Sequence, residues 1–304
     1  MTTTVLLAGA TGDLGQRILR ELLTHDARVR VLTRPGSRSA AALDADDRVD
    51  VVVAAYGDHA ALTEAARGVD VVVSAVSGTR SVIVDAQRAL LAATVAAGVP
   101  RFVPSDWSAD YRSIDVGSNR NFELRREFAA DVDAAPVRAT SVLNGMFTEL
   151  LTGDAPLILF GRHKVLYWSS PDQVLDFTTK DDVARVAALV ALDPDAPRVV
   201  EVAGSRMTAR EIASTMTELT GEPFGLQWAG TTATLSAMSK VGRRLSKDPD
   251  EAFPAWQGMQ YFVNMFSGQA QLRHVDNDRF GAHEWTTVRD VLAAHLGTAA
   301  RTKG

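Results

Sequence analysis

The chain of 304 residues contains no cysteine. This absence excludes disulfide bonds, thiolate metal ligands and cysteine nucleophiles, and it fits an intracellular protein. The sequence also lacks an apolar run of bilayer length, and Met1-Thr-Thr-Thr leads into the first apolar segment without the cationic stretch of a signal peptide. We therefore expect a soluble, globular, cytoplasmic protein that has no membrane partner.

A large excess of charge of one sign is missing too. The chain has 32 lysines and arginines against 37 aspartates and glutamates, a formal net charge of -5, and these charges are scattered. Nucleic-acid binding usually needs a clustered basic surface, so we expect no nucleic-acid partner. The six histidines show no pair at metal-ligand spacing on one helix face, so we expect no metal site.

The start of the chain is its most informative part. The apolar run from Val5 to Ala8 is followed by Gly9, Gly12 and Gly15 at three-residue spacing and then by a helical pattern. In a dinucleotide-binding turn the first glycine allows the tight turn, the second lets the backbone approach a pyrophosphate, and the third lets the helix pack on the strand. A structural glycine-rich turn is the alternative. The context favours a cofactor-binding loop made of Gly9, Thr11, Gly12, Asp13, Leu14 and Gly15.

Strand and helix patterns then alternate at short spacing through the first half. Strand-like apolar runs occur at 5–8, 28–33, 49–54, 69–74, 101–103 and 137–143, with helical patterns between them at 18–24, 60–66, 82–97 and 121–130. This order predicts right-handed crossovers and a parallel sheet covered on both faces. The expected fold class is α/β, a Rossmann-type doubly wound parallel sheet of six strands.

The second half is less regular. A β-hairpin is predicted at 157–160 and 165–168, a strand at 198–203, and helices at 181–192, 235–245, 254–266 and 286–296, with fraying from Gly297. Thr208 and Glu211 have the spacing of a capping box that opens another helix, which stops at Gly221. We expect a nucleotide-binding domain at 1–150 with returning elements at about 174–204, a smaller, mainly helical substrate lobe at 151–173 and 205–297, and a flexible tail at 298–304.

The residues after the second strand indicate which dinucleotide is preferred. A carboxylate there would bind the ribose 2′-OH and repel a 2′-phosphate, and this chain has none. It has Arg34, Ser37 and Arg38, which fit a phosphate and predict NADP(H); a solvated basic turn is the alternative. Asp58, after the third strand, is expected either to bind the adenine amino group or to cap the next helix. At the carboxyl end of the fourth strand, further cofactor contacts are expected from Ser74, Ala75 and Val76.

Further segments add to the loop from Gly9 to Gly15 and to the strand end Leu32-Thr-Arg34. They are Gly98-Val-Pro-Arg-Phe-Val-Pro-Ser-Asp-Trp107, Ala139-Thr-Ser-Val-Leu-Asn-Gly-Met-Phe147, Phe177-Thr-Thr-Lys-Asp-Asp-Val-Ala184 and Met207-Thr-Ala-Arg-Glu-Ile-Ala213. In order and spacing, these segments resemble the NmrA-like and isoflavone-reductase-like branch of the atypical short-chain dehydrogenases over nearly the whole chain. The resemblance implies that Pro104 and Ser105 lie beside the nicotinamide and that Asn144 belongs to the cofactor site.

The chain departs from this family at the catalytic position. Reductases of the isoflavone type carry a lysine in a Phe-Glu-Val-Lys-like helix, where this chain has Phe122-Glu-Leu-Arg125. Arginine does not exchange a proton near neutral pH, but it can hold a developing oxyanion; a solvated residue on a charged helix face is the alternative. The Tyr-x-x-x-Lys pair of ordinary short-chain dehydrogenases is absent as well. The catalytic candidates are Arg125, Tyr111 and Asp106, and further candidates for a proton donor are His163 and Tyr167.

An apolar wall is expected around the substrate. Trp107 directly follows the segment placed beside the nicotinamide, and the other candidates for substrate contact are Met146, Phe147 and Trp168. A second apolar set recurs at helical spacing, and such a stripe more often belongs to a core than to a ligand site; its members are Trp256, Met259, Val263 and Phe266. The substrate implied by this wall is flat and apolar.

These features together predict an NADPH-dependent reductase that transfers a hydride to an aromatic or conjugated small molecule such as a quinone, enone or imine. An electron-poor acceptor needs no acid from the protein, because the cofactor carries the chemistry and the protein aligns the reactants. The alternative is a non-catalytic NADP(H)-binding redox sensor that acts through a protein partner, which the loss of the family lysine favours. A sugar-nucleotide epimerase is disfavoured by the missing tyrosine-lysine pair. We expect a monomer or a homodimer.

Overall fold

The computed structural model describes residues 2–37, 46–248 and 251–302, and its elements form an α/β structure. The chain divides into two compact units. Unit 1 comprises Met1–Trp107, Leu124–Val142 and Val183–Val200, and unit 2 comprises Ser108–Glu123, Leu143–Asp182 and Glu201–Gly304. Each unit is assembled from several chain segments, so neither is a continuous half of the sequence.

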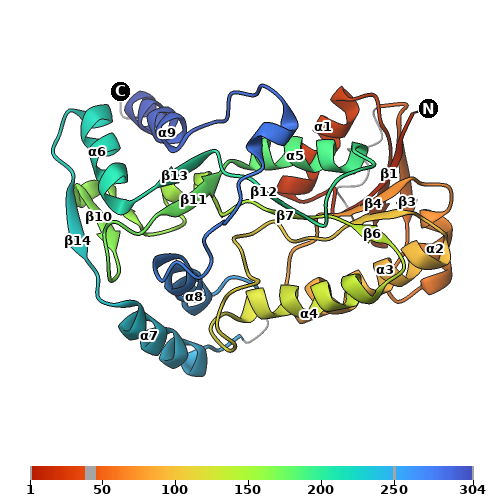
Figure 1. Cartoon of the computed structure of the whole chain (residues 1–304), viewed down its shortest axis with the longest axis horizontal. Coiled ribbons are helices and arrows are strands. Elements are labelled where there is room, and N and C mark those ends of the chain that lie inside the picture. The colour runs from red at the N-terminus through yellow and green to blue at the C-terminus, as the bar shows by residue number, and fades with distance from the viewer. Residues whose placement is uncertain (1, 38–45, 249–250, 303–304) are drawn as a thin grey trace. The chain divides into compact units, whose positions relative to one another are not determined.

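Unit 1 contains a six-stranded parallel sheet. Its strands are β1 (Thr4–Ala8), β2 (Arg28–Thr33), β3 (Val49–Val53), β4 (Val71–Ser74), β5 (Arg101–Val103) and β6 (Arg138–Ala139). They are hydrogen-bonded in the order β3-β2-β1-β4-β5-β6 (Figure 1). The order reverses direction between β1 and β4, and ligands of such sheets bind at the carboxyl ends of the strands beside this reversal. The predicted Rossmann-type sheet is confirmed.

Apolar side chains hold the helices of this unit on the sheet. The helices are α1 (Asp13–Thr24), α2 (His59–Ala66), α3 (Gln87–Ala96), α4 (Arg120–Ala134) and α5 (Lys180–Leu192). Leu6 and Phe102 of the sheet share one buried cluster with Leu62, Leu90 and Phe128, which come from α2, α3 and α4. Figure 1 shows α1 and α5 on the opposite face of the sheet. Both faces are therefore covered, which explains why the central strands β1 and β4 are almost entirely apolar.

The helix predicted at 82–97 has an irregular start. It begins as a π-helical segment, η2 (Ser81–Ala86), before α3. At the junction the buried Gln87 donates from Nε2 to the Ile83 carbonyl at 2.7 Å and accepts the Ser105 N–H on Oε1 at 2.9 Å. The junction therefore fixes the backbone of a residue that follows β5.

Unit 2 contains short strands and helices. The strands are β8 (Met146–Phe147), β9 (Ile158–Leu159), β10 (Lys164–Tyr167), β11 (Leu175–Thr178), β13 (Ser205–Met207) and β14 (Gly225–Trp228), in the sheets β14-β10-β9 and β13-β11-β8. The helices are α6 (Ala209–Thr220), α7 (Thr232–Leu245), α8 (Ala255–Phe266) and α9 (Val288–Thr302), with 3-10 turns η3 (Thr148–Thr152), η4 (Phe160–Arg162) and η5 (Asn277–Phe280). A separate pair joins β7 (Ser141–Leu143) to β12 (Val199–Glu201).

Several local predictions for the second half are confirmed. Lys164 pairs with Leu159 in the antiparallel hairpin of β9 and β10. Thr208 and Glu211 form a reciprocal capping box at the start of α6, and Gly221 ends that helix with a φ of 71°. These features depend on neighbouring residues only, so the sequence pattern identifies them directly.

Two expectations for the second half are wrong. The last helix does not end at Leu296 but continues through Gly297 to Thr302, because the alanines around the glycine are strong helix formers and offset its cost of about 1 kcal/mol. The strands β8, β11, β13 and β14 were not predicted. They are two to four residues long, which is too short for a two-residue alternation to appear in the sequence.

Candidate functional site

The glycine loop joins β1 to α1 at the carboxyl end of the central strand. Gly9 has a φ of +85°, and the Gly12 N–H donates to its carbonyl at 3.0 Å. A Cβ at Gly9 would lie 2.5 Å from the Ala75 carbonyl oxygen, and a Cβ at Gly15 would lie 2.1 Å from the Gly9 carbonyl oxygen. No larger residue fits at either position, so the tight turn and the close packing of α1 both need glycine.

The start of α1 is open to an anion. Gly12 is the N-cap and is exposed, and as a glycine it has no side chain that could cap the helix. The carboxylate of Asp13 pairs with Arg17 Nε at 2.8 Å on the helix surface. Backbone N–H groups at an uncapped helix start and the positive end of the helix dipole favour a phosphate. The loop, which also includes the half-buried Thr11 and Leu14, therefore fits the pyrophosphate of a dinucleotide.

A guanidinium group lies at the end of the neighbouring strand. Arg34 directly follows β2 and is exposed, and the half-buried Ser37 donates its N–H to the Arg34 carbonyl at 3.1 Å, which closes a turn. Burial raises the pKa of the Tyr56 phenol above its ordinary value, and the charge of Arg34 offsets a part of this effect. Arg34 is therefore close to the end of β3 and carries the charge that a 2′-phosphate needs. Arg38, the third residue predicted for this role, lies outside the described residues.

Asp58 has one of its two predicted roles. It is the N-cap of α2, and its Oδ1 accepts a hydrogen bond from the Ala61 N–H at 3.0 Å. Helix capping is therefore confirmed. The contact of Asp58 with an adenine amino group stays a prediction.

The ends of β4 and β5 are tied together through backbone oxygens. The Trp107 indole N–H donates to the Ser74 carbonyl at 3.0 Å, and the Ser105 hydroxyl donates to the Val76 carbonyl at 2.6 Å. The Ala75 N–H continues the sheet by donating to Ala8. Because Trp107 and Ser105 both follow β5, these bonds fix the spacing of the two strand ends beside the predicted nicotinamide position.

Two features of this edge bear on ligand binding. Ser74 is fully buried, and among the described residues its hydroxyl oxygen has no hydrogen-bond partner. Trp107 is buried as well, at 6% exposure, and Pro104 beside it is also buried. The indole of Trp107 thus supports the end of β4 in this structure, and its contact with a substrate stays a prediction.

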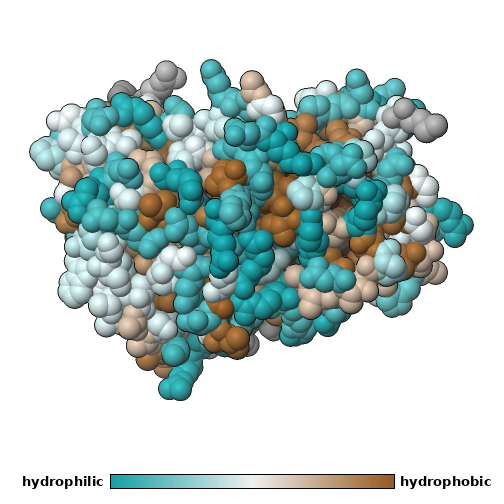
Figure 2. Space-filling view, viewed as in Figure 1, coloured by the Kyte–Doolittle hydropathy of each residue, from teal (hydrophilic) through white to brown (hydrophobic). Residues whose placement is uncertain are grey.

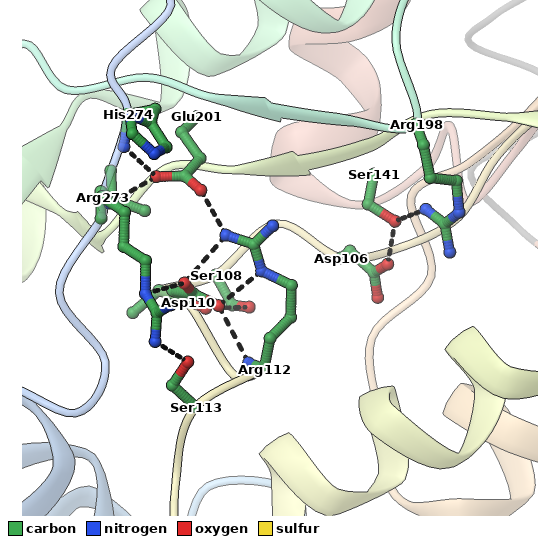
Figure 3. A network of polar contacts seen from close by, with 12 residues as sticks. Asp106, Ser108, Asp110, Arg112, Ser113, Ser141, Arg198, Glu201, Arg273 and His274 are labelled. Carbon is green, nitrogen blue, oxygen red and sulfur yellow. Dashed lines mark hydrogen bonds and ion pairs between the residues drawn. The ribbon is translucent and has the colours of Figure 1, made fainter.

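Asp106 takes part in a directed chain of hydrogen bonds (Figure 3). Its Oδ2 accepts from the Ser141 hydroxyl at 2.6 Å, and the oxygen of Ser141 accepts from Arg198 Nη1 at 2.7 Å. Arg198 also donates from Nε to Asp133 at 2.7 Å. Because a guanidinium group only donates, the single proton of Ser141 must point at Asp106. Asp106 is therefore an acceptor at Oδ2, and its predicted role as a proton donor stays a prediction.

Arg125 is buried within unit 1. It lies on α4 and is only 8% exposed, and the preceding Leu124 packs against Ile83 and Val84. The alternative interpretation, a solvated arginine on a charged helix face, is therefore wrong. The catalytic role of this buried guanidinium group stays a prediction.

The remaining predicted site residues belong to unit 2. Tyr111 is 3% exposed, and Asn144 is fully buried. The Asn144 backbone is held at both polar groups, since its N–H donates to the Ser108 carbonyl at 2.8 Å and its carbonyl accepts from Thr178 Oγ1 at 2.7 Å. Its side-chain Nδ2 donates to the Gly145 carbonyl at 3.3 Å, and its Oδ1 has no hydrogen-bond partner among the described residues. The Asn144 amide is thus a fixed group with a spare acceptor.

The predicted substrate wall separates into core and partly exposed residues. Trp168 stacks on Phe262 with ring centroids 5.2 Å apart, and Met146 belongs to the same buried cluster. Phe147 is half-buried, and the Lys180 Nζ lies 5.9 Å from the centre of its ring. The apolar stripe on α8 belongs to the core, as the more common interpretation predicts. Trp256 and Phe266 are buried, and Met259 and Val263 are partly buried against a core cluster.

An ionic network around two buried carboxylates in unit 2 was not predicted from the sequence (Figure 3). Arg112 donates from Nε to Asp110 Oδ1 at 2.8 Å and also bonds to Glu201, and hydrogen bonding to Asp110 raises its pKa further above the ordinary value. Both carboxylates are buried. Glu201 Oε2 also accepts the N–H groups of Arg273 and His274 at 2.6 and 3.0 Å, so the network holds the loop that carries Tyr111. The one sequence feature that could have indicated this network is Glu201, because it is a carboxylate inside the apolar run Val199-Val-Glu-Val-Ala.

Two of the histidines lie beside carboxylates. His163 Nδ1 is 3.1 Å from Glu222, and His283 Nε2 is 2.8 Å from Asp182; Tyr167 is half-buried. In the described ranges no group of three or more histidine, aspartate and glutamate side chains is placed to hold a metal ion. The same part of the chain contains no helix with the length and apolar character needed to cross a membrane.

The fold and the strand-end residues define a class of protein, the Rossmann-type dinucleotide-binding proteins. The chain belongs to the NmrA-like family, whose model matches residues 1–245. This assignment agrees with the resemblance identified from the sequence.

Individual relatives are more distant. The chain is 30% identical over 200 residues to the bifunctional pinoresinol-lariciresinol reductase 3 of Thuja plicata, and the match covers 59% of this chain and 62% of that protein. A solved structure of AtPrR2 with NADP+ and (+)pinoresinol matches with a TM-score of 0.79 at 22% identity, over 97% of this chain and 99% of the other. The NADPH-dependent quinone oxidoreductase QOR2 of Escherichia coli, complexed with NADPH, matches with a TM-score of 0.74 at 21% identity, over 96% and 99%.

Proposed function

We propose that this chain is an NADPH-dependent reductase that transfers a hydride to a small aromatic or conjugated acceptor such as a quinone, enone or imine. The observation that carries the proposal is the carboxyl edge of the sheet in unit 1. There, a loop with no room for a Cβ at Gly9 or Gly15, a helix start whose N-cap is a glycine and an exposed arginine follow two neighbouring strands. Family membership and the names of the relatives, which are reductases and a quinone oxidoreductase, support the same activity.

The residues of this edge have separate roles in the proposal. The N–H groups of the first turn of α1 bind the pyrophosphate, and Arg34 with Ser37 binds the 2′-phosphate. The Ser74 hydroxyl, which has no partner among the described residues, offers a hydrogen bond to the bound nucleotide. The bonds of Ser105 and Trp107 to the end of β4 keep this surface fixed, which limits the rearrangement needed on binding.

The bound dinucleotide supplies the hydride, that is two electrons and one proton. A quinone that accepts this hydride needs one further proton, which water can deliver to a stabilised hydroquinone anion. Arg125 cannot provide that proton, because guanidinium groups stay protonated at any working pH, but its buried charge can stabilise the anion. We therefore favour electron-poor acceptors over ethers and simple carbonyls as substrates.

Turnover tests this proposal. The purified full-length chain is incubated with NADPH and a panel of quinones, enones, imines and cationic dyes, and oxidation of the cofactor is followed by absorbance. We expect turnover of at least one electron-poor acceptor and a preference for NADPH over NADH. Tight binding of NADPH together with no turnover of any acceptor would contradict the proposal.

The second candidate is a redox sensor that binds NADP(H) and signals through a protein partner. Arg125 in place of the family lysine is the observation that favours it. A sensor should bind NADPH and NADP+ with different affinities and show no turnover, whereas an enzyme should turn over. The same titrations and assays therefore separate the two functions.

A further inference from the structure

Helix α7 packs on its neighbour through small residues. Ser239 is buried and donates from its hydroxyl to the Trp256 carbonyl of α8 at 3.0 Å. A Cβ at Gly242 would already lie 3.0 Å from the Trp256 Cβ, so the two helices approach closely at this point. Leu235 is the one large residue of α7 that the structure buries in its described part. The face of α7 toward α8 is therefore largely small and polar.

The large apolar residues of α7 point away from this face. Met238, Val241 and Leu245 are 57%, 54% and 75% exposed. They occur at positions i, i+3 and i+7, so they form one stripe along the helix, called the α7 stripe below. An amphipathic helix of a globular protein normally buries such a stripe, and clustered exposed apolar residues usually mark an interaction surface.

Positive charge accompanies the α7 stripe. Lys240, Arg243, Arg244 and Lys247 lie on or directly after the helix, and no carboxylate occurs in the sequence from residue 223 to residue 247. Within the described residues, none of these four cations forms an ion pair, although Arg243 lies 5.6 Å from the centre of the Trp256 ring. Three aspartate and glutamate residues follow directly at 248, 250 and 251, so the positive excess belongs to α7 itself, which has three cations and no carboxylate.

We infer that the α7 stripe and its cations form a docking surface for an anionic lipid surface. Apolar side chains that enter the interface between headgroups and acyl chains, next to lysine and arginine, are the signature of a helix that lies on a membrane. Figure 2 shows brown and teal side chains side by side at the lower left edge, where Figure 1 places α7. The contact is peripheral, so it is consistent with the absence of a membrane-crossing helix in the described part of the chain. It differs from the expectation of no membrane partner, which rested on the lack of a spanning segment and stays a prediction.

Two other occupants fit this surface less well. A groove that encloses a basic amphipathic helix would need access to most of its circumference, but α7 is already packed on α8. A second copy of the chain would place the same surface on both sides of a two-fold axis, so the like charges of Arg244 and Lys240 would face each other. A lipid surface needs only one face and supplies the opposite charge.

Vesicle binding by the full-length chain tests the inference. We use vesicles of phosphatidylcholine alone and vesicles in which a third of the lipid is phosphatidylglycerol, and we measure the fraction of protein that sediments. We expect binding to the anionic vesicles only, weakened by added salt. The variant Lys240→Gln/Arg244→Gln/Lys247→Gln should lose about 100-fold in partition coefficient, since each cation near an anionic surface contributes about fivefold. The variant Met238→Gln/Leu245→Gln should lose roughly tenfold or more, because it removes apolar side chains without lowering helix propensity.

Matched controls separate this site from general charge effects. Arg20→Gln/Arg28→Gln/Arg162→Gln removes three exposed cations elsewhere, and Val116→Gln removes an exposed apolar side chain from a different segment. Both should bind vesicles like the original chain, and circular dichroism should show every variant folded. Equal loss in the control triple variant would overturn the inference, and so would the absence of binding to anionic vesicles. A concentration-dependent mass that Met238→Gln/Leu245→Gln reduces to that of a monomer would assign the stripe to self-association and overturn it as well.

Discussion

The two units hold their candidate site residues by different physical means. In unit 1 the site residues are held mainly by contacts with the backbone. Gly9 and Gly15 leave no room for a Cβ, and side chains that follow β5 bond to carbonyl groups at the end of β4. In unit 2 the loop that carries Tyr111 is held by the buried carboxylates of Asp110 and Glu201, which share the partly exposed guanidinium group of Arg112. A site fixed by backbone contacts should fail when one carbon is added, and a site fixed by buried charge should fail when one partner is removed.

The largest effect is expected from removing the central charge of the network. Arg112→Met leaves Asp110 and Glu201 buried without their shared cation, which should lower the free energy of unfolding by about 3 kcal/mol, the low end for a buried pair because Arg112 itself is partly exposed. Urea unfolding measures this change. Arg289→Met provides the matched control, because Arg289 pairs with Glu218 at an exposed position and should change stability by less than about 1 kcal/mol. Equal losses of stability in the two variants would show that the network contributes no more to stability than an exposed ion pair does.

A smaller loss, confined to nucleotide binding, is expected when one carbon is added to the glycine loop. Gly15→Ala places a Cβ 2.1 Å from the Gly9 carbonyl oxygen, so α1 must shift away from the turn. The affinity for NADPH should fall by about 100-fold, equivalent to about 2.7 kcal/mol, as measured by fluorescence titration. Gly57→Ala should bind normally, because nothing lies within 4 Å of a Cβ at that position. Normal NADPH binding by Gly15→Ala would remove the backbone argument for unit 1.

The same contrast explains how much the sequence could predict. The sheet and its glycine loop were predictable because each depends on a short run of neighbours, such as Val5 to Ala8 before Gly9. The network was not predictable, because Arg112 and Glu201 are distant in the sequence and each alone has the appearance of an ordinary charged residue. Short strands such as β8 were missed for a related reason, since their partners lie far along the chain.

The candidate site divides along the same line. The placement of Arg34 at the end of β2 follows from local pattern alone. The burial of Arg125 does not follow from local pattern, because it depends on which residues pack around α4. The motif Phe122-Glu-Leu-Arg125 carries no information on that packing. Likewise, a tryptophan at position 107 predicts an aromatic contact, but only the fold shows that its N–H donates to Ser74.

A third variant sharpens the nucleotide preference of unit 1. Arg34→Ala removes the guanidinium group proposed to bind the 2′-phosphate, and a charge-assisted hydrogen bond of this kind contributes roughly 1.5 to 3 kcal/mol. The preference for NADPH over NADH should therefore fall by about tenfold or more, while NADH binding stays unchanged. Arg20→Ala, an exposed arginine on α1, should leave the preference intact. An unchanged preference in Arg34→Ala would assign this residue to a solvated turn.

The smallest effects concern pH, and the two units should respond with opposite signs. In unit 1, hydrogen bonding to Arg80 lowers the pKa of Glu127 below its ordinary value of 4.5. The folded state therefore binds this proton less tightly than the unfolded state, so the stability gained from the pair is present above pH 4.5 and is lost as pH falls through the lowered pKa. In unit 2, burial raises the pKa of Asp176 above 3.8, although Arg206 and the Leu272 N–H both bond to it. Stability is then lost as pH rises from 3.8 through the raised pKa.

Two substitutions separate these contributions in the pH dependence of urea unfolding. Glu127→Gln should flatten the loss of stability on the acid side of pH 4.5, by less than about 1 kcal/mol because this ion pair is partly exposed. Asp176→Asn should instead flatten the loss that accompanies rising pH, whatever its effect on the baseline stability. Slopes that change in the same direction in both variants would contradict the contrast, since a surface ion pair favours the ionised carboxyl and a buried site disfavours it. Changes of opposite sign would mean that burial has a larger effect on the pKa of Asp176 than its hydrogen-bond partners have. Burial also makes the carboxylates of Asp110 and Glu201 depend on the positive charge of Arg112.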